Sequence, residues 1–524
     1  MFAIPHSVLT LSSDMNTVTF SHTRVLCRVK TWLALTLWTV CLGRADAADR
    51  LPNIVILYAD DMGFGDLGAN NPASKIPTPN LDRLAAEGTR FTDAHSSSGI
   101  CTPSRYALLQ GRYHWRKFHG IVNSFGEPVL DADRCTLSSL LLSKGYDTAC
   151  IGKWHLGWNW ASIQKPGAQA DKAHGFAPDA FDWSKPILGG PLSHGFAYYF
   201  GDDVPNFPPY AWFENDRVKT VPTVPVTPPA QPLEGHWEAR PGPSVDGWDF
   251  YAVMPTLTSK AENWIKTRNP EKPFFLYFPF TSPHAPIVPA PEFQGRSKAG
   301  AFGDYVCQTD DTVGRVLNAL REKGLEKDTL VIFSADNGAE SYAYERIRNF
   351  DHFSSGPFRG VKRDLWEGGH HVPMVVRWPG HVPAGRAAEG LMSQIDIYAT
   401  IAAAVGATIA PRAAEDSVNQ LDFWRGKTAS NRSSLVHNTN PKNYALRSGD
   451  WLLVDAPSGG VSKVPTWYDE QFGYTKNADK GELYDLKTDP AQKKNLHGSH
   501  PQKVAELQTE LRRIREAGDN APAQ

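Results

Sequence analysis

The sequence predicts an α/β protein with a mostly parallel sheet flanked by helices, followed by a smaller C-terminal α+β subdomain. Five short apolar runs are nearly continuous rather than alternating, which is typical of strands covered on both faces. Helical patterns separate these runs, and strands that alternate with helices favour a parallel sheet. After about residue 410 the pattern changes to short strands followed by one amphipathic helix.

The expected elements follow one another along the chain. Strands are expected at 53–59, 148–151, 274–280, 329–335 and 373–378, and helices at 80–88, 137–145, 304–324 and 393–406. In the C-terminal part, strands are expected within 444–454 and at 481–486, and a helix at 501–518, ending in Gly518. The proline-rich segment 219–235 is expected to be a surface loop. The expected boundaries are 1–48 for a signal peptide, 49–410 for the main domain and 411–524 for the C-terminal subdomain.

Composition and the N-terminus limit the class of protein. The 524 residues carry a formal net charge of −2, so there is no overall positive field to attract nucleic acid. Arg24, Arg28 and Lys30 precede an apolar run at 32–43, which is followed by small residues. This pattern predicts a secretory signal, too short to span a bilayer, with Met15 as a candidate start; a buried N-terminal helix is the alternative. The mature chain is therefore expected to be secreted or periplasmic, without stable membrane insertion.

Few cysteines remain once that signal is removed. Cys27 and Cys41 leave with it, and Cys101, Cys135, Cys150 and Cys307 stay, too few for a disulfide-dependent fold of this size. Cys135 and Cys150 are expected to be either bridged or simply buried. Cys101 precedes Thr102 and Pro103, which predict a helix capped by Thr102 with Pro103 at its first position. A thiol there can be a nucleophile, a metal ligand or a small core residue.

Polar side chains directly follow four of the predicted strands. They are Asp60 and Asp61, Lys153 and His155, His284, and Asp336 and Asn337. Because ligands of open α/β sheets bind beyond the carboxyl ends of the strands, we expect these groups to converge there. Asp and Asn are also common in turns, which is the simpler explanation for any one pair.

The expected crevice combines oxygen ligands with positive charges. Asp60, Asp61, Asp336 and Asn337 supply only oxygen, which suits calcium or magnesium rather than zinc. Without a cation, the three carboxylates would repel one another. Arg105, Lys153 and Lys362 are available to the same crevice, so the sequence predicts a receptor for an oxyanion.

Several segments resemble the type I sulfatases, the arylsulfatase-like family whose cysteine in C-x-P-S-R is oxidised to formylglycine (3-oxoalanine). The resemblance begins with CTPSR at 101–105 and ALLQGR at 107–112. It extends, in the family's order from about residue 52 to 496, to PNIVILYADDMGFGDLG, GYDTACIGKWHLG, HGFAYYFG, FTSPHAP, FSADNGAE, FRGVKRDLWEGGHHVPMVVRWPG and GELYDLKTDP. It implies an alkaline-phosphatase-like fold and the hydrolysis of a sulfate monoester, with a sulfated carbohydrate as the expected substrate.

The resemblance also implies a role for each candidate residue. Cys101 would become the formylglycine nucleophile through a formylglycine-generating maturation enzyme, and Ca²⁺, in preference to Mg²⁺, would be bound by Asp60, Asp61, Asp336, Asn337 and the modified Cys101. Arg105 and Lys153 would hold the hydroxyls of the hydrated aldehyde, and His284 and Lys362 would contact the sulfate and the leaving group.

The chemistry implied is a displacement in which one hydroxyl of the aldehyde hydrate attacks sulfur, followed by an elimination that releases sulfate. His284 is a suitable general acid for the leaving alcohol. His155 would then take the proton of the second hydroxyl, so that the covalent enzyme–sulfate intermediate releases sulfate and restores the aldehyde. A serine would lack that second hydroxyl.

Two regions depart from the family pattern. The chain continues GDDVPNFPPY after 198–201, where relatives often carry a small hydroxyl residue, and we assign no role there. A long stretch between 157 and 194 contains Trp158, Trp160 and Trp183. These side chains are expected either to wall the substrate pocket and stack on sugar rings or to pack within the stretch itself.

Two other functions remain open from the sequence. A phosphonate or phosphate ester hydrolase of the same superfamily would use a related site, although a two-zinc phosphatase would need additional His and Asp ligands and a Ser or Thr nucleophile. A non-catalytic anion-binding protein would result if Cys101 were never matured.

Overall fold

The computed structural model describes residues 50–171, 175–226 and 238–517. The expected signal peptide at 1–48, residues 227–235 of the proline-rich segment and Gly518 lie outside these ranges. The residues from Pro52 onward form one unit by their mutual contacts, so the boundary expected near residue 410 stays a prediction. Among the described residues, no helix combines the length and the apolar character needed to cross a membrane.

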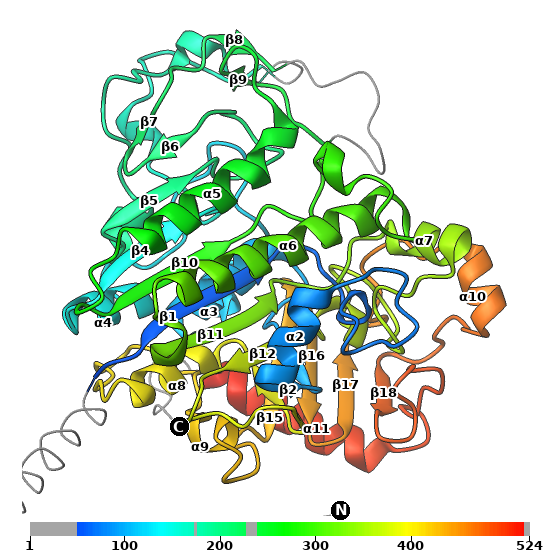
Figure 1. Cartoon of the computed structure of the whole chain (residues 1–524). Coiled ribbons are helices and arrows are strands. Elements are labelled where there is room, and N and C mark those ends of the chain that lie inside the picture. Colours follow the sequence, from blue (N-terminus) through cyan, green and yellow to red (C-terminus); the bar gives the residue numbers. More distant parts are fainter. Residues whose placement is uncertain (1–49, 172–174, 227–237, 518–524) are drawn as a thin grey trace, which may run out of the picture. The chain divides into compact units, whose positions relative to one another are not determined.

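A twisted mixed sheet forms the centre of this unit (Figure 1). Ten of the described strands belong to it, in the order β13 (Arg386–Ala388), β2 (Thr89–Phe91), β12 (Met374–Arg377), β11 (Thr329–Ala335), β1 (Asn53–Ala59), β10 (Phe274–Pro279), β4 (Asp147–Ile151), β5 (Tyr198–Gly201), β6 (Phe213–Glu214) and β7 (Arg217–Val218). Each residue of β1 is buried, as the continuous apolar run predicts for a strand covered on both faces.

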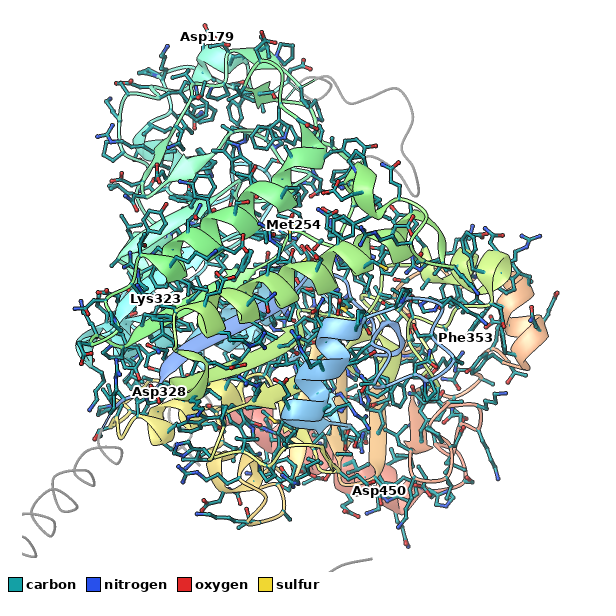
Figure 2. All side chains as sticks on the ribbon, in the orientation of Figure 1. Asp179, Met254, Lys323, Asp328, Phe353 and Asp450 are labelled. Atoms are coloured by element: carbon teal, nitrogen blue, oxygen red, sulfur yellow. The ribbon has the colours of Figure 1, made fainter. Side chains whose placement is uncertain are left out.

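The five central strands from β11 to β5 run parallel, which confirms the predicted fold class. The strand expected at 373–378 exists as β12, but it pairs antiparallel with β11. The reason is that residues 336–373 do not cross to the other end of the strands. β12 therefore begins at the end of the sheet where β11 finishes, and it runs in the opposite direction. Figure 2 labels Lys323 and Asp328 at the opposite edge, where β11 begins.

Helices cover both faces of the sheet. The helices described are α2 (Pro79–Glu87), α3 (Cys101–Gln110), α4 (Leu137–Ser143), α5 (Val253–Lys266), α6 (Gly300–Glu322), α7 (Ala343–Phe350), α8 (Asp396–Ala404), α9 (Leu421–Trp424), α10 (Thr466–Phe472) and α11 (Pro501–Glu516). In Figure 1, α2, α5 and α6 lie across one face, where their apolar side chains share a core with β1, β10 and β11. α3 covers the other face, since the guanidinium of Arg105 lies over the ring of Tyr58 in β1.

The C-terminal part adds a small antiparallel sheet. Its strands are β15 (Ser434–Asn440), β16 (Asn443–Ser448), β17 (Trp451–Asp455) and β18 (Glu482–Asp485). Leu446 and Leu453 of this sheet share a core with Leu507 of α11 and with Tyr113 and Ile395 from the main part of the chain. Two short pairs complete the described strands, β3 (Ala94–His95) with β14 (Met392–Ser393) and β8 (Val224–Pro225) with β9 (Pro243–Ser244).

The start of α3 differs from the prediction. The helix begins at Cys101, with Ile100 rather than Thr102 in the capping position, so Pro103 is the third helical residue. Proline is tolerated throughout the first turn because the N–H groups there have no intrahelical acceptor. The hydroxyl of Thr102 instead donates to the carbonyl of His155 (2.9 Å) and accepts from the amide of Val122 (3.2 Å). The helix therefore presents Cys101 in its first turn and is tied to the segment after β4.

Candidate active site

Four parallel strands end at the same edge of the sheet and bring the predicted polar residues together. β11, β1, β10 and β4 are neighbours in that order, so the segments that follow them meet. Candidate ligand atoms of Asp60, Asp61, Cys101 and His284 all lie within 4.8 Å of one another. Cys101 is the first residue of α3, so this side chain comes from a helix and not from the end of a strand.

The acidic side chains are held by buried positive charges. Lys153 Nζ lies 2.5 Å from Asp60 Oδ2, and Lys362 Nζ lies 2.7 Å from Asp61 Oδ1. Arg105 donates to Asp336 through Nε and Nη2, and its Nη2 is 3.5 Å from Asp60 Oδ2. Each of these three positively charged side chains therefore contacts a predicted metal ligand and orients its carboxylate.

Two oxygen atoms in this cluster lack a hydrogen-bond donor. Asp60 Oδ1 and Asn337 Oδ1 are buried and have no partner among the described residues, while the amide nitrogen of Asn337 donates to Asp61 Oδ1 over 2.7 Å. Buried oxygens without a donor are costly unless a ligand satisfies them. Carboxylate and amide oxygens are preferred by hard divalent cations, so the residues present fit a metal ion.

The carboxyl groups differ in their readiness to ionise. Burial and the neighbouring charge of Asp60 raise the pKa of Asp336 to about 6. Burial acts in the same direction on Asp61, but the charges of Lys362 and His284 outweigh it and hold the pKa of Asp61 well below its usual range. A divalent cation would favour the ionised form of Asp336 because it offsets the repulsion between the carboxylates.

The thiol of Cys101 is not an activated nucleophile as it stands. Its side chain is buried, and burial raises the pKa of the thiol despite the nearby charges of Lys362 and Lys153. A thiol with a raised pKa is a poor nucleophile at neutral pH. The unmodified cysteine is therefore unsuited to attack, which agrees with a precursor role.

Of the two ring nitrogens of His155, only Nε2 makes a hydrogen bond with the described residues. Its Nε2 faces the carbonyl oxygen of Val122 at 2.9 Å, so Nε2 carries the hydrogen, and Nδ1 has no partner among the described residues. Burial and the charges of Lys153 and Arg105 lower the pKa of His155 well below its usual value. The neutral ring therefore offers Nδ1 as a proton acceptor.

His284 and Lys362 lie on the other side of Asp61. His284 Nε2 is 3.7 Å from Asp61 Oδ2, and its Nδ1 faces the carbonyl of Ala285 at 2.5 Å. Burial and the charge of Lys362 lower the pKa of His284 to about 4. An anion bound next to this ring would favour its protonated form.

Comparisons with known proteins agree with this geometry. The family model described as Sulfatase matches residues 52–407. The chain belongs to the sulfatase family. It is 32% identical over 493 residues to an N-acetylgalactosamine-6-O-sulfatase of Bacteroides thetaiotaomicron, covering 88% of this chain and 93% of the relative. It is 33% identical to arylsulfatase A of Bos taurus, covering 88% and 86%.

A solved structure from work on glycosaminoglycan metabolism by Bacteroides thetaiotaomicron is also similar. It superposes with a TM-score of 0.75 at 30% identity, covering 89% of this chain and 99% of that one. These similarities confirm the predicted family, the fold class and the activity of the chain as a sulfuric ester hydrolase. The family implies a metal ion and a formylglycine at the cysteine of the signature.

The sulfatase site contains residues that the sequence analysis did not single out. Glu340 lies 3.8 Å from Lys362 Nζ and accepts a hydrogen bond from Arg363 Nη1 over 2.7 Å. Glu340 stands in FSADNGAE and Arg363 directly follows Lys362, so their place in the matched segments was the available signal. Thr102, expected only as a cap, links the first turn of α3 to the backbone of His155.

The tryptophans between 157 and 194 pack within the sulfatase rather than facing a ligand. Trp158 and Trp160 are 1% and 2% exposed, and Trp183 is also buried. Trp158 stacks on Phe213 with 5.3 Å between ring centroids, and Trp160 contacts Trp183 edge to face. Of the two possibilities left open for these side chains, their burial supports packing within the protein, because protein atoms already cover the rings.

Among the described residues, the cysteines outside the signature are free thiols. Cys150 and Cys307 are buried and Cys135 is half-buried. Of the two possibilities left open for Cys135 and Cys150, a bridge is therefore excluded in this structure.

Proposed function

We propose that this sulfatase hydrolyses sulfate monoesters of carbohydrates. The reaction would use formylglycine at position 101 and a divalent cation, with calcium preferred to magnesium. The observation that carries the proposal is the meeting of Cys101 with Asp60, Asp61 and His284 within 4.8 Å. Buried lysine and arginine side chains surround this point, which suits a sulfate group that carries negative charge.

The cation would be held by Asp60, Asp61, Asp336, Asn337 and the modified side chain at 101. Together, the cation and the hydrated aldehyde would supply an oxygen nucleophile that is anionic at neutral pH. Arg105 orients Asp336 for this role through its two hydrogen bonds. Lys153 holds Asp60 in the same way.

The two histidines would move protons at different points. His284 would donate a proton to the leaving alcohol, since the negative charge of a bound sulfate ester would raise the pKa of the ring from its low value of about 4. His155 would accept a proton at Nδ1, because Nε2 is committed to Val122. Lys362 would bind sulfate oxygens beside Asp61.

The substrate is proposed from the relatives. Several of them, from a bacterium and from mammals, carry names that specify the 6-sulfate of N-acetylgalactosamine. A 6-sulfated N-acetylgalactosamine is therefore the first substrate to test.

The test begins with mass spectrometry of the peptide that contains Cys101, to measure its conversion to formylglycine. Matured protein is then assayed for sulfate release from 6-sulfated N-acetylgalactosamine, other sulfated sugars, an aryl sulfate and an aryl phosphonate. We expect sulfate release that is lost in Cys101→Ala and after chelation of the metal. Faster cleavage of the phosphonate, or no cleavage of any sulfate by matured, calcium-loaded protein, would reject the proposal.

The N-terminal pattern supports export of this sulfatase to the periplasm or the cell exterior. Maturation of Cys101 also requires a formylglycine-generating enzyme as a transient partner. N-terminal sequencing of the mature protein tests export, with cleavage expected near residue 48. An intact N-terminus on active protein would contradict it.

A further inference from the structure

A second cluster of potential ligands lies outside the catalytic residues. His95 at the end of β3, His370 directly after the turn Glu367–Gly369 and His437 in β15 have no solvent exposure. Nitrogen atoms of these three rings lie within 4.8 Å of one another. Buried histidines usually find hydrogen-bond partners, so the contacts of each ring nitrogen decide what this cluster does.

The hydrogen bonds fix the tautomers of His95 and His370. His95 Nε2 lies 2.7 Å from Asp93 Oδ1, and His370 Nε2 lies 3.1 Å from the carbonyl oxygen of Leu365. Both partners are acceptors, so both Nε2 atoms carry hydrogen. The Nδ1 atoms of His95 and His370, 3.1 Å apart, then face each other with lone pairs.

Two facing lone pairs repel unless a proton or a metal ion lies between them. Both rings are fully buried, so solvent does not reach the two facing nitrogens. Imidazole nitrogen is a preferred ligand of zinc and other borderline cations. An ion is therefore the better way to satisfy both nitrogens.

His437 provides an independent indication of a missing ligand. Its ring is fully buried, and neither Nδ1 nor Nε2 has a hydrogen-bond partner among the described residues. The ring stacks on His370 with 3.4 Å between centroids. A metal lies in the plane of each imidazole that binds it, so the ring of His437 must tilt from this stack when an ion binds.

The surroundings resemble the outer shell of a zinc site. A carboxylate hydrogen-bonded to the second nitrogen of a metal-binding histidine orients the ring and raises its basicity, and Asp93 occupies that position on His95. Glu367 supplies a second buried carboxylate, 3.9 Å from His95 Nε2, with its Oε1 unpartnered among the described residues. Arg447 lies 3.1 Å from Asp93 Oδ2 and 3.6 Å from Glu367 Oε2, so these two carboxylates share one positive charge before an ion binds.

We propose that His95, His370 and His437 form a second metal site, which binds zinc and is separate from the catalytic cation. The ion would join three segments that are remote in sequence. Ser96 N donates to His370 O over 2.9 Å, and Ser98 Oγ donates to Asn438 O over 2.7 Å. A bound ion would therefore restrict the movement of the segment between His95 and Cys101, and so of the start of α3.

The test uses full-length, calcium-saturated protein incubated with zinc chloride and freed of excess metal. We expect elemental analysis to find about one zinc per chain in the wild type. Diffraction data collected on both sides of the zinc absorption edge should place an anomalous peak among the three rings. The absence of an anomalous peak at this position in zinc-treated crystals would overturn the proposal, even if the variants described below did not fold.

Variants separate zinc binding here from zinc binding at the catalytic cluster. His437→Gln should lose the zinc and the zinc-dependent rise in melting temperature, whereas His381→Gln, at an exposed histidine, should keep both. Asp93→Asn should weaken zinc binding about 10- to 100-fold without abolishing it. If His437→Gln folds and retains zinc as the wild type does, His437 is not a ligand and the three-histidine site is rejected.

Discussion

Arg105 and Asp336 form a fully buried ion pair in which Nε and Nη2 of the arginine donate to Asp336 Oδ2 over 3.1 and 2.8 Å. Neither side chain is reached by solvent. Removal of one partner from such a pair leaves an uncompensated charge in the interior. We expect Arg105→Ala to lower the free energy of unfolding by about 3–5 kcal/mol, measured by urea denaturation of the metal-free protein.

The matched control is Arg217→Ala, because Arg217 is exposed, lies 3.9 Å from Asp216 and donates an exposed hydrogen bond to the carbonyl of Ser184. Its effect should stay below about 1 kcal/mol. Equal destabilisation by the two substitutions would contradict the importance of the buried pair.

Cys101→Ser tests whether the modified side chain is needed for turnover rather than for attack. A serine has one hydroxyl, so it can accept a sulfo group but cannot expel sulfate by forming an aldehyde. We expect at most a single stoichiometric release of the alcohol, and mass spectrometry should find one sulfo group on the peptide that contains residue 101. Sustained turnover at the wild-type rate would disprove the need for formylglycine.

His284→Gln should slow the sulfatase most on substrates with poor leaving groups. A sugar alcohol needs a proton as it departs, whereas nitrophenolate leaves without one, so the loss should be about 10²–10⁴-fold on a sulfated sugar and much smaller on nitrophenyl sulfate. The measurement is kcat for both substrates. The same loss on both would assign His284 to binding instead of proton transfer.

Cation binding should weaken as the pH falls through about 6. The pKa of Asp336 is raised to about 6, above the value of about 3.9 for a free aspartate. The metal-free fold therefore holds a proton there, and the stability contributed by that proton is present below about pH 4 and lost as the pH rises through about 6. A cation must displace the proton, so its affinity should fall by up to about tenfold per pH unit below 6.

Calorimetric titration of the metal-free protein with calcium at several pH values measures this dependence. The affinity should be constant between pH 7.5 and 8.5, where Asp336 is ionised. An affinity that is also constant between pH 7 and 5 would show that Asp336 does not bind the cation.

Trp158→Ala should cost stability without altering the choice of sugar. Trp158 is buried against Phe213 and Tyr199, so truncation leaves a cavity that costs about 3–5 kcal/mol. Thermal denaturation and relative kcat/KM on a panel of sulfated sugars measure the two effects. A changed order of preference in folded protein would restore a substrate-binding role for this side chain.

Much of the fold follows from local sequence patterns. The strands at 53–59 and 329–335 have the predicted bounds, because a continuous apolar run between polar residues specifies a strand buried on both faces. The start of α3 was misplaced, since Pro103 suits any position of the first turn. The direction of β12 was not predictable, because it depends on the path of residues 336–373 rather than on the strand itself.

Some residues of the candidate site were predictable from the sequence, and others were not. The oxygen ligands after β1 and β11 stand out because each directly follows a strand. The contact of His155 with Val122 carries no sequence signal, and the only signal for the contact of Glu340 with Lys362 is that both residues stand in matched segments. The histidine cluster was missed for the same reason, as His95 and His370 are 275 residues apart.

The sequence by itself determined the chemistry available to this sulfatase: the cysteine of the signature, the oxygen ligands, the cations and the histidines, and the strands that end beside them. The tertiary structure decided which of these groups meet and in which protonation state. Contacts between remote residues depend on strand order and on the burial of each side chain. Burial and neighbouring charges set the pKa values, and specific atoms of Asp60, Asn337, His155 and His437 have no hydrogen-bond partner in the part of the chain that the structure describes.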